Sequence, residues 1–480
     1  MILSPRAVID IGSNAIRLVV YGGPPRAPMP IYNEKARIAL GDSVSRSGKI
    51  DAEVMDAAIA TLVRFDALTR AMQVGERHII ATEATRRATN GAEFLARAAD
   101  AGVAIEMISG EAEARASALG VVCDMPWAEG YVADQGGGSL ELAMIEDAVP
   151  AQPISMPFGT IPLSQRGDIN PKTIAKDIEA RLDRAGGFAI RHGLPLHLVG
   201  GAWRALGQLH MQTIGYPLTI LSNYTLPQAA LSDLAKVVEN ETTMQASGVV
   251  STARIPFMPA AMATLEALDR IFAPSEIRVS VYGLREGLLF DRLDPELRRE
   301  DPLIAAARHE GKRLSRFAYH GDGISGWIAP LFDDDPPRLV RLRHAACLLA
   351  DSAWNSHPEY RAIHAAGLAL EGNWPGVTAE DRAILAGALY AAYGGKRPGL
   401  PMLAELAAEA DLDRARLWGL AVRLAQRLDG GTGTALGSVA LLRRNGKIGL
   451  DYAGQYRQLE ASTVKRRLKQ LNEAFAASNR

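Results

Sequence analysis

Two segments of this 480-residue chain share a pattern in which an apolar strand ends on an aspartate and a glycine-containing turn follows. The segments are VIDIGSN at residues 8–14 and VADQGGGS at residues 132–139. Alternating apolar residues resume after each turn, which predicts a second strand in each case. A hairpin needs only one or two permissive residues. Three successive glycines beside Asp134 therefore indicate a close approach to the backbone.

The surroundings of the two segments indicate a duplicated unit. After the first segment, predicted helices and strands alternate as in an α/β sheet with crossover connections. These elements are a helical period at 51–73, a short strand near 78–82, a helix at 93–101, a strand at 103–108 and a helix opening at Ser109. After the second, a helix at 171–192, a strand at 196–201 and a further helix repeat this order. Residues 22–30, GGPPRAPMP, read as a loop.

Beyond residue 303 the pattern becomes helical, rich in alanine and leucine, with one hairpin at Asn445-Gly446. The predicted helices are 303–319, 338–354, 359–371, 378–393, 401–428 and a basic closing helix at 456–477. We predict three domains: a first α/β domain at 1–125, a second at 126–302, and a mainly helical domain at 303–480.

Composition gives few further constraints. The formal net charge is −1, so nothing draws the whole chain to nucleic acid or membranes, and any anion site must be built locally. Cys123 and Cys347 lie in apolar surroundings without metal-ligand spacing, which predicts buried reduced thiols. Without a leader-like or membrane-spanning segment, we expect a soluble cytoplasmic protein with no nucleic-acid or membrane partner.

The two turns are suited to binding phosphate. Backbone N–H groups of Gly12, Ser13 and Asn14 can converge on one point, and those from Gly136, Gly137 and Gly138 to Ser139 can do the same. Asp10 and Asp134 at the strand ends suit Mg²⁺, which favours a few carboxylates together with substrate oxygens. The alternative is two tight hairpins whose carboxylates cap the turns.

The chain resembles the exopolyphosphatase / guanosine pentaphosphate phosphatase (Ppx/GppA) family, within the actin-like, sugar-kinase-like ATPase fold of duplicated ribonuclease H-like domains. The resemblance extends over roughly residues 5–295. It rests on VIDIGSNAIRLVV (8–20), ATEATRRATN (81–90), ISGEAEAR (108–115), VADQGGGSLEL (132–142), VGGAWRALG (199–207) and YGLREGLL (282–289). Several specific motifs in order make a stronger match than any one alone.

The resemblance implies a general base. ISGEAEAR is similar to a family segment in which the second glutamate of a pair orients and deprotonates the attacking water, and that position here is Glu113. The first glutamate of the pair is replaced by Ala112. If the register were shifted by two residues, Glu111 would be the rival base.

Further contacts are also implied by the resemblance. Arg86, with Thr82 nearby, matches the arginine segment that contacts phosphates, where a guanidinium fork can neutralise transferred charge. Arg17 faces either the cleft or solvent. Glu141 would hold metal or water, or be an exposed strand residue. Gly200 and Gly201 match a third glycine turn beside the nucleoside site of the wider fold, followed by Trp203 and Arg204, for which a lid role and a core role both remain open.

The helical domain resembles the family's extension, which is related to the His-Asp metal phosphohydrolases. Its metal motif is degraded, because Ala350 precedes Asp351 where a His-Asp pair would need histidine. His344, His357 and His364 remain. Packing, homodimer formation or a basic wall for long substrates fits better than metal chemistry. Residues that could form this wall are Arg338, Arg341, Arg343, Lys465, Arg466, Arg467 and Lys469.

These features predict an exopolyphosphatase that uses Mg²⁺ to release orthophosphate from the end of inorganic polyphosphate. Guanosine pentaphosphate (pppGpp) is the alternative substrate, since it ends in the same anhydride. Two other classes remain open: a kinase of the same fold, and a non-catalytic sensor of polyphosphate or alarmone, which the replacement of the family's first glutamate by Ala112 leaves open. The resemblance also suggests a homodimer.

Overall fold

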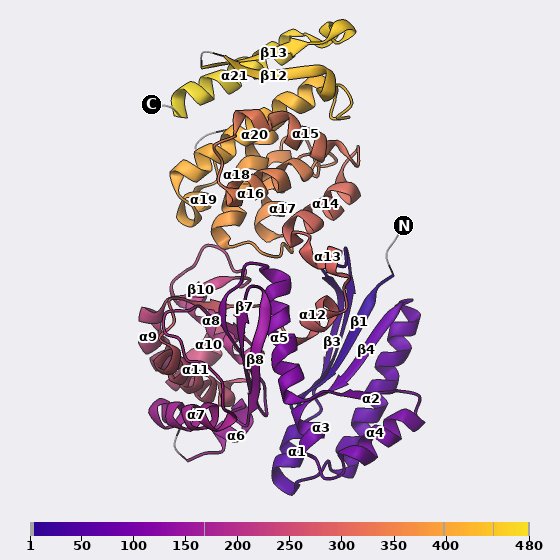
Figure 1. The fold of residues 1–480 in the computed structure, drawn as a ribbon, viewed down its shortest axis with the longest axis vertical. Helices are drawn as coiled ribbons and strands as arrows, with labels where there is room; N and C mark the ends of the chain where they lie inside the picture. Colours follow the sequence, from indigo (N-terminus) through magenta and orange to yellow (C-terminus); the bar gives the residue numbers. More distant parts are fainter. Residues whose placement is uncertain (1–3, 168, 397–398, 445, 479–480) are drawn as a thin grey trace. The chain divides into compact units, whose positions relative to one another are not determined.

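The computed structural model describes residues 4–167, 169–396, 399–444 and 446–478. It contains two compact units, Met1–Arg299 and Glu300–Arg480, which we describe separately (Figure 1). The predicted domain divisions at 125/126 and 302/303 stay predictions.

The first sheet of unit 1 contains the first aspartate-ended strand at its centre. Its order is β3 (Met29–Ala36), β2 (Ile16–Gly22), β1 (Arg6–Ile11), β4 (Glu76–Ala81) and β5 (Glu106–Met107). β1 is antiparallel to β2 and parallel to β4. Crossover connections carry the helices α1 (Leu40–Ser47), α2 (Ala52–Ala71), α3 (Glu83–Arg87) and α4 (Gly91–Asp100). The predicted strand at 103–108 is reduced to the two residues of β5.

The second sheet repeats this topology. Its order is β10 (Tyr224–Leu226), β11 (Ile277–Val279), β9 (Leu196–Val199), β6 (Gly130–Gln135), β7 (Leu140–Glu146) and β8 (Val149–Met156). β6 is antiparallel to β7 and parallel to β9, as β1 is to β2 and β4. The helices are α6 (Thr160–Ser164), α7 (Pro171–Ala185), α8 (Gly201–Thr213), α9 (Leu231–Glu239), α10 (Glu241–Ser247) and α11 (Met258–Phe272).

The two aspartate-ended hairpins correspond residue by residue. Asp10 pairs with Arg17 across the first hairpin, and Asp134 pairs with Glu141 across the second. The Gly12 amide donates to the Ala15 carbonyl at 3.1 Å. At the equivalent position of the second hairpin, two residues after Asp134, the Gly136 amide donates to the Ser139 carbonyl at 3.0 Å. The duplication inferred from the sequence is therefore present in the backbone of the turns.

Two helices connect the sheets. α5 (Gly110–Asp124) begins where the Ser109 hydroxyl accepts a hydrogen bond from the Ala112 amide at 3.1 Å, as expected for a serine N-cap. It packs against β6, β7 and β8 and against α12 (Leu284–Asp291). α12 places Leu289 in a buried cluster with Val8 and Val19 of the first sheet. α13 (Pro295–Arg299) then ends unit 1.

Two predictions about local structure in unit 1 are wrong. The helix expected at 171–192 ends at Ala185, because Gly186 and Gly187 take φ values of 62° and 116°, which stop a helix. The loop expected at 22–30 already contains the start of β3. Proline is tolerated on an edge strand, so Pro30 does not prevent β3 from forming at the sheet edge.

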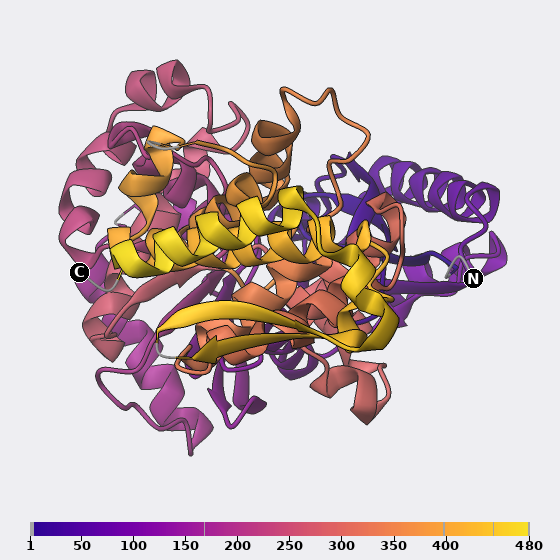
Figure 2. The same ribbon diagram turned by 90° about the horizontal axis from the view of Figure 1, so that it is seen from above.

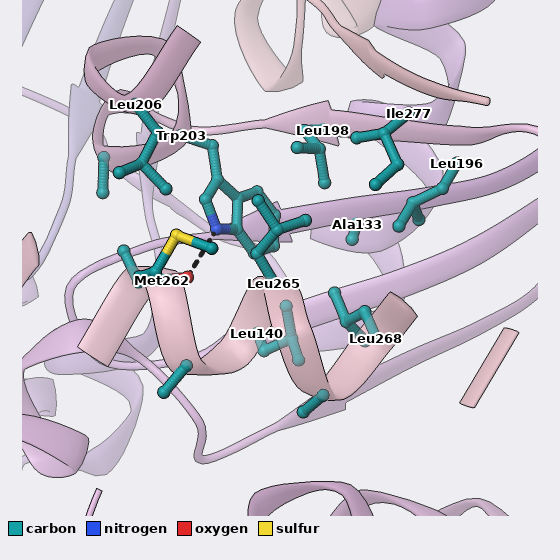
Figure 3. Packing of buried hydrophobic residues seen from close by; sticks show 14 of the residues in the cluster. Ala133, Leu140, Leu196, Leu198, Trp203, Leu206, Met262, Leu265, Leu268 and Ile277 are labelled. Carbon is teal, nitrogen blue, oxygen red and sulfur yellow. Dashed lines mark hydrogen bonds between the residues drawn. The ribbon is translucent and has the colours of Figure 1, made fainter. Parts of the chain in front are cut away.

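Trp203 belongs to the core and has no lid role. Its side chain is fully buried, and its indole N–H donates to the Ala261 carbonyl at 2.9 Å. Figure 3 shows it among Leu206, Met262 and Leu265, between α8 and α11. A buried indole needs an acceptor for its N–H, and this bond supplies one.

Unit 2 is mainly helical. Its elements are α14 (Pro302–Leu314), α15 (His320–Ile328), α16 (Pro337–Leu348), α17 (Arg361–Glu371), α18 (Ala379–Ala392), α19 (Pro401–Leu406), α20 (Glu409–Asp429), β12 (Val439–Arg444), β13 (Lys447–Tyr452) and α21 (Ser462–Ser478). The predicted hairpin is formed by β12 and β13, although Asn445 lies outside the described residues. α21 lies beside it, joined by two hydrogen bonds between the Asn472 side chain and the Ile448 backbone (Figure 2).

Helix ends in unit 2 differ from the prediction. The helix expected at 303–319 ends at Leu314 and the separate α15 follows, while the closing helix begins at Ser462 instead of residue 456.

Both cysteines are free and buried. Across the described ranges, no helix is both long and apolar enough to cross a membrane.

The degraded metal motif of unit 2 is engaged in other contacts. His344 pairs with Asp322 at 2.8 Å, and the buried Asp351 carboxylate binds the Arg316 guanidinium at 2.7 Å. His357 and His364 are exposed. In the parts of the chain that the structure describes, no group of three or more His, Cys, Asp or Glu side chains could hold a metal ion.

His197 on β9 predicts a pH dependence of stability. Burial lowers the pKa of this imidazole to about 4, and its Nε2 lies 3.0 Å from the Glu129 carbonyl. In the unfolded chain this histidine takes up a proton near pH 6.5, whereas in the folded protein it stays neutral down to about pH 4. The free energy of unfolding therefore falls between these pH values, by up to about 1.4 kcal/mol per pH unit. We expect His197→Gln to lose less thermal stability than wild type between pH 7.5 and 5.

The control for this comparison is His192→Gln, because His192 is an exposed histidine of the same unit. It should keep the wild-type pH dependence. Equal slopes for wild type and His197→Gln would contradict the assignment.

Candidate functional site

A cavity of about 290 Å³ in unit 1 brings the repeated turns together. Most of the predicted site residues line it: Asp10, Gly12, Ser13, Asn14, Arg17, Glu113, Asp134, Gly136, Gly137, Gly138, Ser139, Gly200, Gly201 and Arg204. Thr82, Arg86 and Glu141 are outside this lining. Residues from distant parts of the sequence therefore share one cavity, as the resemblance implies.

The two turns are in contact with each other. A Cβ on Gly137 would lie 3.3 Å from the Ser13 Cβ, and one on Gly138 would overlap the Glu83 carboxylate. None of the three glycines has a positive φ. The lack of a side chain therefore serves close packing at Gly137 and Gly138, whereas a Cβ on Gly136 would lie 3.7 Å from the Ser139 carbonyl, in ordinary contact. For Gly138 the neighbour is Glu83, a residue that sequence reasoning did not single out.

The backbone of the second turn is fixed from one side. The Thr160 and Ile161 amides at the start of α6 donate to the Gly136 and Gly137 carbonyls at 3.1 and 2.8 Å. The Gly136 amide is itself engaged by the Ser139 carbonyl, as the Gly12 amide is by the Ala15 carbonyl. The predicted anion site would therefore use the remaining amides of the two turns, from Ser13 and Asn14 and from Gly137 to Ser139, and it stays a prediction.

Glu113 lies in the first turn of α5 and lines the cavity. Its Oε2 is buried without a hydrogen-bond partner among the described residues, 3.9 Å from the Arg86 guanidinium. Burial, and then the nearby Glu141 and Asp134, raise the pKa of Glu113 well above its usual value. A raised pKa makes a carboxylate a stronger base, and one that lines a cavity can accept a proton from a water bound there.

Glu111 has a different environment. It is exposed, and hydrogen bonds from its own backbone amide and from Ser109 lower the pKa of its carboxyl group. A carboxylate stabilised in its charged form is a weaker base. Of the two candidates left open by the sequence, Glu113 alone lines the cavity.

The predicted metal ligands lie around Glu113. Asp10 accepts from the Arg285 guanidinium at 3.3 Å, and Asp134 accepts from the Ser117 hydroxyl at 2.5 Å. Glu141 is buried, accepts from Ser155 at 2.8 Å, and has a pKa raised to about 8 by burial and by Asp134. Burial also raises the pKa of both aspartates.

These carboxylates fit a divalent cation. Several acidic groups repel one another in a buried place, and the Glu113 Oε2 lacks a partner, so a cation would relieve an electrostatic cost. Within the described residues no three of them already have the spacing of a metal site. An ion here would take one or two carboxylates and obtain its other ligands from substrate and water, which is typical of Mg²⁺.

Arg86 and Thr82 lie behind the cavity surface. The Arg86 guanidinium donates to the Ile108 carbonyl at 2.8 Å, which holds it near Glu113. Thr82 is buried, and its hydroxyl lies 3.4 Å from the Ile11 carbonyl. Thr82 therefore supports β1, and a direct contact of either residue with substrate stays a prediction.

The third glycine turn contributes a buried cation. Gly200 has a φ of 121°, and a Cβ there would lie 2.6 Å from the Gln135 carbonyl, so only glycine fits. Arg204 donates to the Val281 carbonyl at 3.1 Å. Burial and the neighbouring Arg285 lower the pKa of Arg204 to about 10.

Sequence reasoning missed four further cations of the lining: Lys35, Arg37, Arg254 and Arg285. Lys35 belongs to β3 and Arg37 follows it, whereas Arg254 comes from the segment before α11. Burial and then Arg37 lower the pKa of Arg254, so these two lining cations lie near each other. The alternation of Lys35 and Arg37 would have been a signal only if β3 had been recognised as a strand.

The cavity thus has two electrostatic ends. Asp10, Glu113 and Asp134 form the acidic end, while Arg254, Lys35 and Arg37 form a basic end. A duplicated α/β fold of this topology, with a cavity that combines acidic and basic groups, defines a protein of the actin-like class.

Comparison with known proteins agrees with this class. Residues 19–296 match the Ppx/GppA phosphatase family, and residues 333–477 match the exopolyphosphatase C-terminal family. The chain belongs to the Ppx/GppA phosphatase family. The predicted fold class is confirmed, with its two sheets and helical C-terminal region. Enzymes of this family generally need divalent metal ions.

Individual relatives cover different parts of the chain. Exopolyphosphatase 1 of Mycobacterium tuberculosis is 28% identical over 309 residues, 60% of this chain and 88% of the relative. Retrograde regulation protein 2 of Saccharomyces cerevisiae is 27% identical over 438 residues, 82% and 73% of the two chains. The crystal structure of an Aquifex aeolicus Ppx/GppA family member has a TM-score of 0.53 at 25% identity, covering 60% of this chain and 96% of that one.

The basic end predicts the effect of a charge substitution. Arg254→Met removes a guanidinium from the cavity, and we expect roughly tenfold weaker binding of inorganic tripolyphosphate, the value for one charge-assisted hydrogen bond. Isothermal titration of wild type and variant with tripolyphosphate measures this. Arg270→Met is the matched control, because Arg270 is an exposed arginine on α11. Equal losses in the two variants would contradict a role specific to the cavity.

Proposed function

We propose that the protein is an exopolyphosphatase that releases orthophosphate from the end of inorganic polyphosphate, with Glu113 as the general base. One observation carries this proposal: the Glu113 carboxylate, buried with an unpartnered oxygen, lines a cavity that also contains two glycine turns and a row of cations. The similarity to mycobacterial exopolyphosphatase 1 supports the choice of substrate.

The geometry suggests how the residues act. The terminal phosphates lie in the cavity against the turns at residues 12–14 and 136–139, and the rest of the chain extends toward Lys35, Arg37 and Arg254. Glu113 takes a proton from a water molecule while the water oxygen attacks the terminal phosphorus in line with the bridging oxygen. The P–O bond to the bridging oxygen breaks, orthophosphate leaves, and the shortened chain keeps that oxygen.

Charge neutralisation supplies much of the expected rate enhancement. In this mechanism Arg86, which the Ile108 carbonyl holds near Glu113 outside the cavity lining, would turn toward the transferred phosphoryl group and neutralise its charge. Asp10, Asp134 and Glu141 would hold a divalent ion, which when bound would neutralise phosphate oxygens.

Replacing the base tests the mechanism. Glu113→Gln keeps the size of the side chain but removes its basicity, so we expect orthophosphate release to fall about 10²- to 10⁴-fold, with polyphosphate binding retained. Release is measured with a phosphate-detection assay and binding by titration.

The control is Glu111→Gln, which alters the exposed glutamate two residues earlier and should change the rate by less than about twofold. A large loss in Glu111→Gln, or undiminished turnover in Glu113→Gln, would overturn the assignment of the base.

A second substrate ends in the same anhydride. Guanosine pentaphosphate would place its 5′-triphosphate along the same cavity, with the guanosine beyond the basic end. We expect long-chain polyphosphate to be the preferred substrate, because cations continue past the first turn. Orthophosphate release from each, measured in competition, decides this: a higher kcat/KM for the pentaphosphate would reverse the preference.

A regulatory, non-catalytic function is the candidate of another class. Its support is the similarity to retrograde regulation protein 2 over 82% of this chain, together with Ala112 at a position where the family has glutamate. Under that function polyphosphate would bind without turnover in the wild-type protein. The homodimer implied by the family resemblance is a further proposal, which sedimentation of the full chain tests.

A further inference from the structure

Glu83 is a buried carboxylate that the proposed mechanism does not use. It occupies the first position of α3 and is 6% exposed, yet it is not part of the cavity lining. Burying a carboxylate is costly unless it is paired and hydrogen-bonded. The Glu83 carboxylate therefore needs contacts that stabilise it, and two segments distant in sequence contact it.

The first partner is the turn after β1. The Ser13 hydroxyl donates to Glu83 Oε2 at 3.0 Å, and the Arg87 guanidinium donates to Glu83 Oε1 at 2.6 Å. Because the Ser13 hydroxyl proton is engaged in this bond, the turn is left to present its backbone amides to the cavity. The carboxylate thereby sets the orientation of a residue in the phosphate site without lining the cavity itself.

The second partner is the turn after β6. A Cβ on Gly138 would overlap the Glu83 carboxylate and would lie 2.9 Å from the Ser13 hydroxyl oxygen. Glu83 therefore lies directly against the backbone of Gly138, more than fifty residues away in sequence and in the other half of the duplicated fold. Gly138 is glycine because this carboxylate leaves no room for a side chain.

Both sides of the contact are rigidly held. The Thr82 amide donates to the Ile11 carbonyl at 3.2 Å, and the Gly41 amide donates to the Ser13 carbonyl at 2.7 Å. On the opposite side, Gly159 packs so closely on Gly138 that a Cβ there would overlap the backbone of the turn. A contact between two such fixed parts defines a distance, because neither part can adjust without moving its support.

We propose that Glu83 is a positioning residue that fastens the two glycine turns to each other and so fixes the spacing between the two sets of phosphate-binding amides. This rests on the proposed function, since the spacing matters only if one phosphate chain contacts both turns. Glu83 acts through Ser13 and Gly138 and touches neither substrate nor the attacking water.

Four variants test the proposal. Glu83→Ala removes the contact, and Gly138→Ala displaces Glu83. Each variant should lower kcat/KM for polyphosphate roughly tenfold to hundredfold. The loss should come mainly through KM, because misplaced binding groups weaken substrate binding while the general base Glu113 is unchanged. Glu83→Gln keeps the acceptor for Ser13 and should stay within about threefold of wild type.

The double variant Glu83→Ala/Gly138→Ala is the sharpest comparison. Without the carboxylate, the two nearest atoms to the new methyl group are gone and the Ser13 hydroxyl at 2.9 Å, which can rotate, is the next, so the double variant should match Glu83→Ala alone instead of showing the product of the two losses. Multiplicative losses, or a Glu83→Gln as impaired as Glu83→Ala, would overturn the proposal. Thermal unfolding of all four variants shows whether each is folded.

Hydrogen exchange separates this proposal from the proposed function. In Glu83→Ala, amide exchange should increase at residues 12–15 and also at residues 136–139, whatever the substrate. Unchanged exchange at 136–139 would overturn the role of Glu83 even if the enzyme hydrolyses polyphosphate. Increased exchange at both turns in a protein that releases no orthophosphate would retain Glu83 as the link and reject the proposed function.

Discussion

The contact between two hydrogen-bonded turns is the constraint on which the site of unit 1 depends. Each turn is closed by one amide–carbonyl bond, from Gly12 to Ala15 and from Gly136 to Ser139. Because each follows the central strand of its sheet, the register of β1 and β6 decides where Asp10 and Asp134 lie. Once the turns meet, both aspartates line the same cavity. Moving either strand by one residue would turn its aspartate to the other face.

Electrostatics then give the cavity a direction. The acidic end alone would repel a phosphate chain, and the basic end alone would bind many anions without selecting an end. In the proposed function, the acidic end lies beside the terminus of the phosphate chain and the basic end lies along its remaining charge. The raised pKa of Glu113 and the lowered pKa of Arg254 both arise first from burial.

Local patterns in the sequence predicted the parts of the site that lie on one strand, turn or helix end. The two turns, Glu113 after the Ser109 cap, and the glycines at 200 and 201 all belong to short motifs with their own geometry. Arg254, Lys35 and Arg285 belong to no such motif, and only the tertiary fold brings them to the cavity. The end of α7 was missed because the helical period continued past Gly186, although two glycines with positive φ stop the helix there.

Glu83 shows why the reason for a residue type can differ from what its motif suggests. The three glycines after Asp134 were interpreted as room for a polyanion, but for Gly138 the room is taken by a carboxylate of the same chain. The return of α12 to the first sheet, where Tyr21 donates to the Glu286 carboxylate and Leu289 packs on Val8, gives the two halves a second connection at a distance from the turns. Glu83 and α12 therefore link the two halves at different places, so the spacing of the turns does not depend on a single contact.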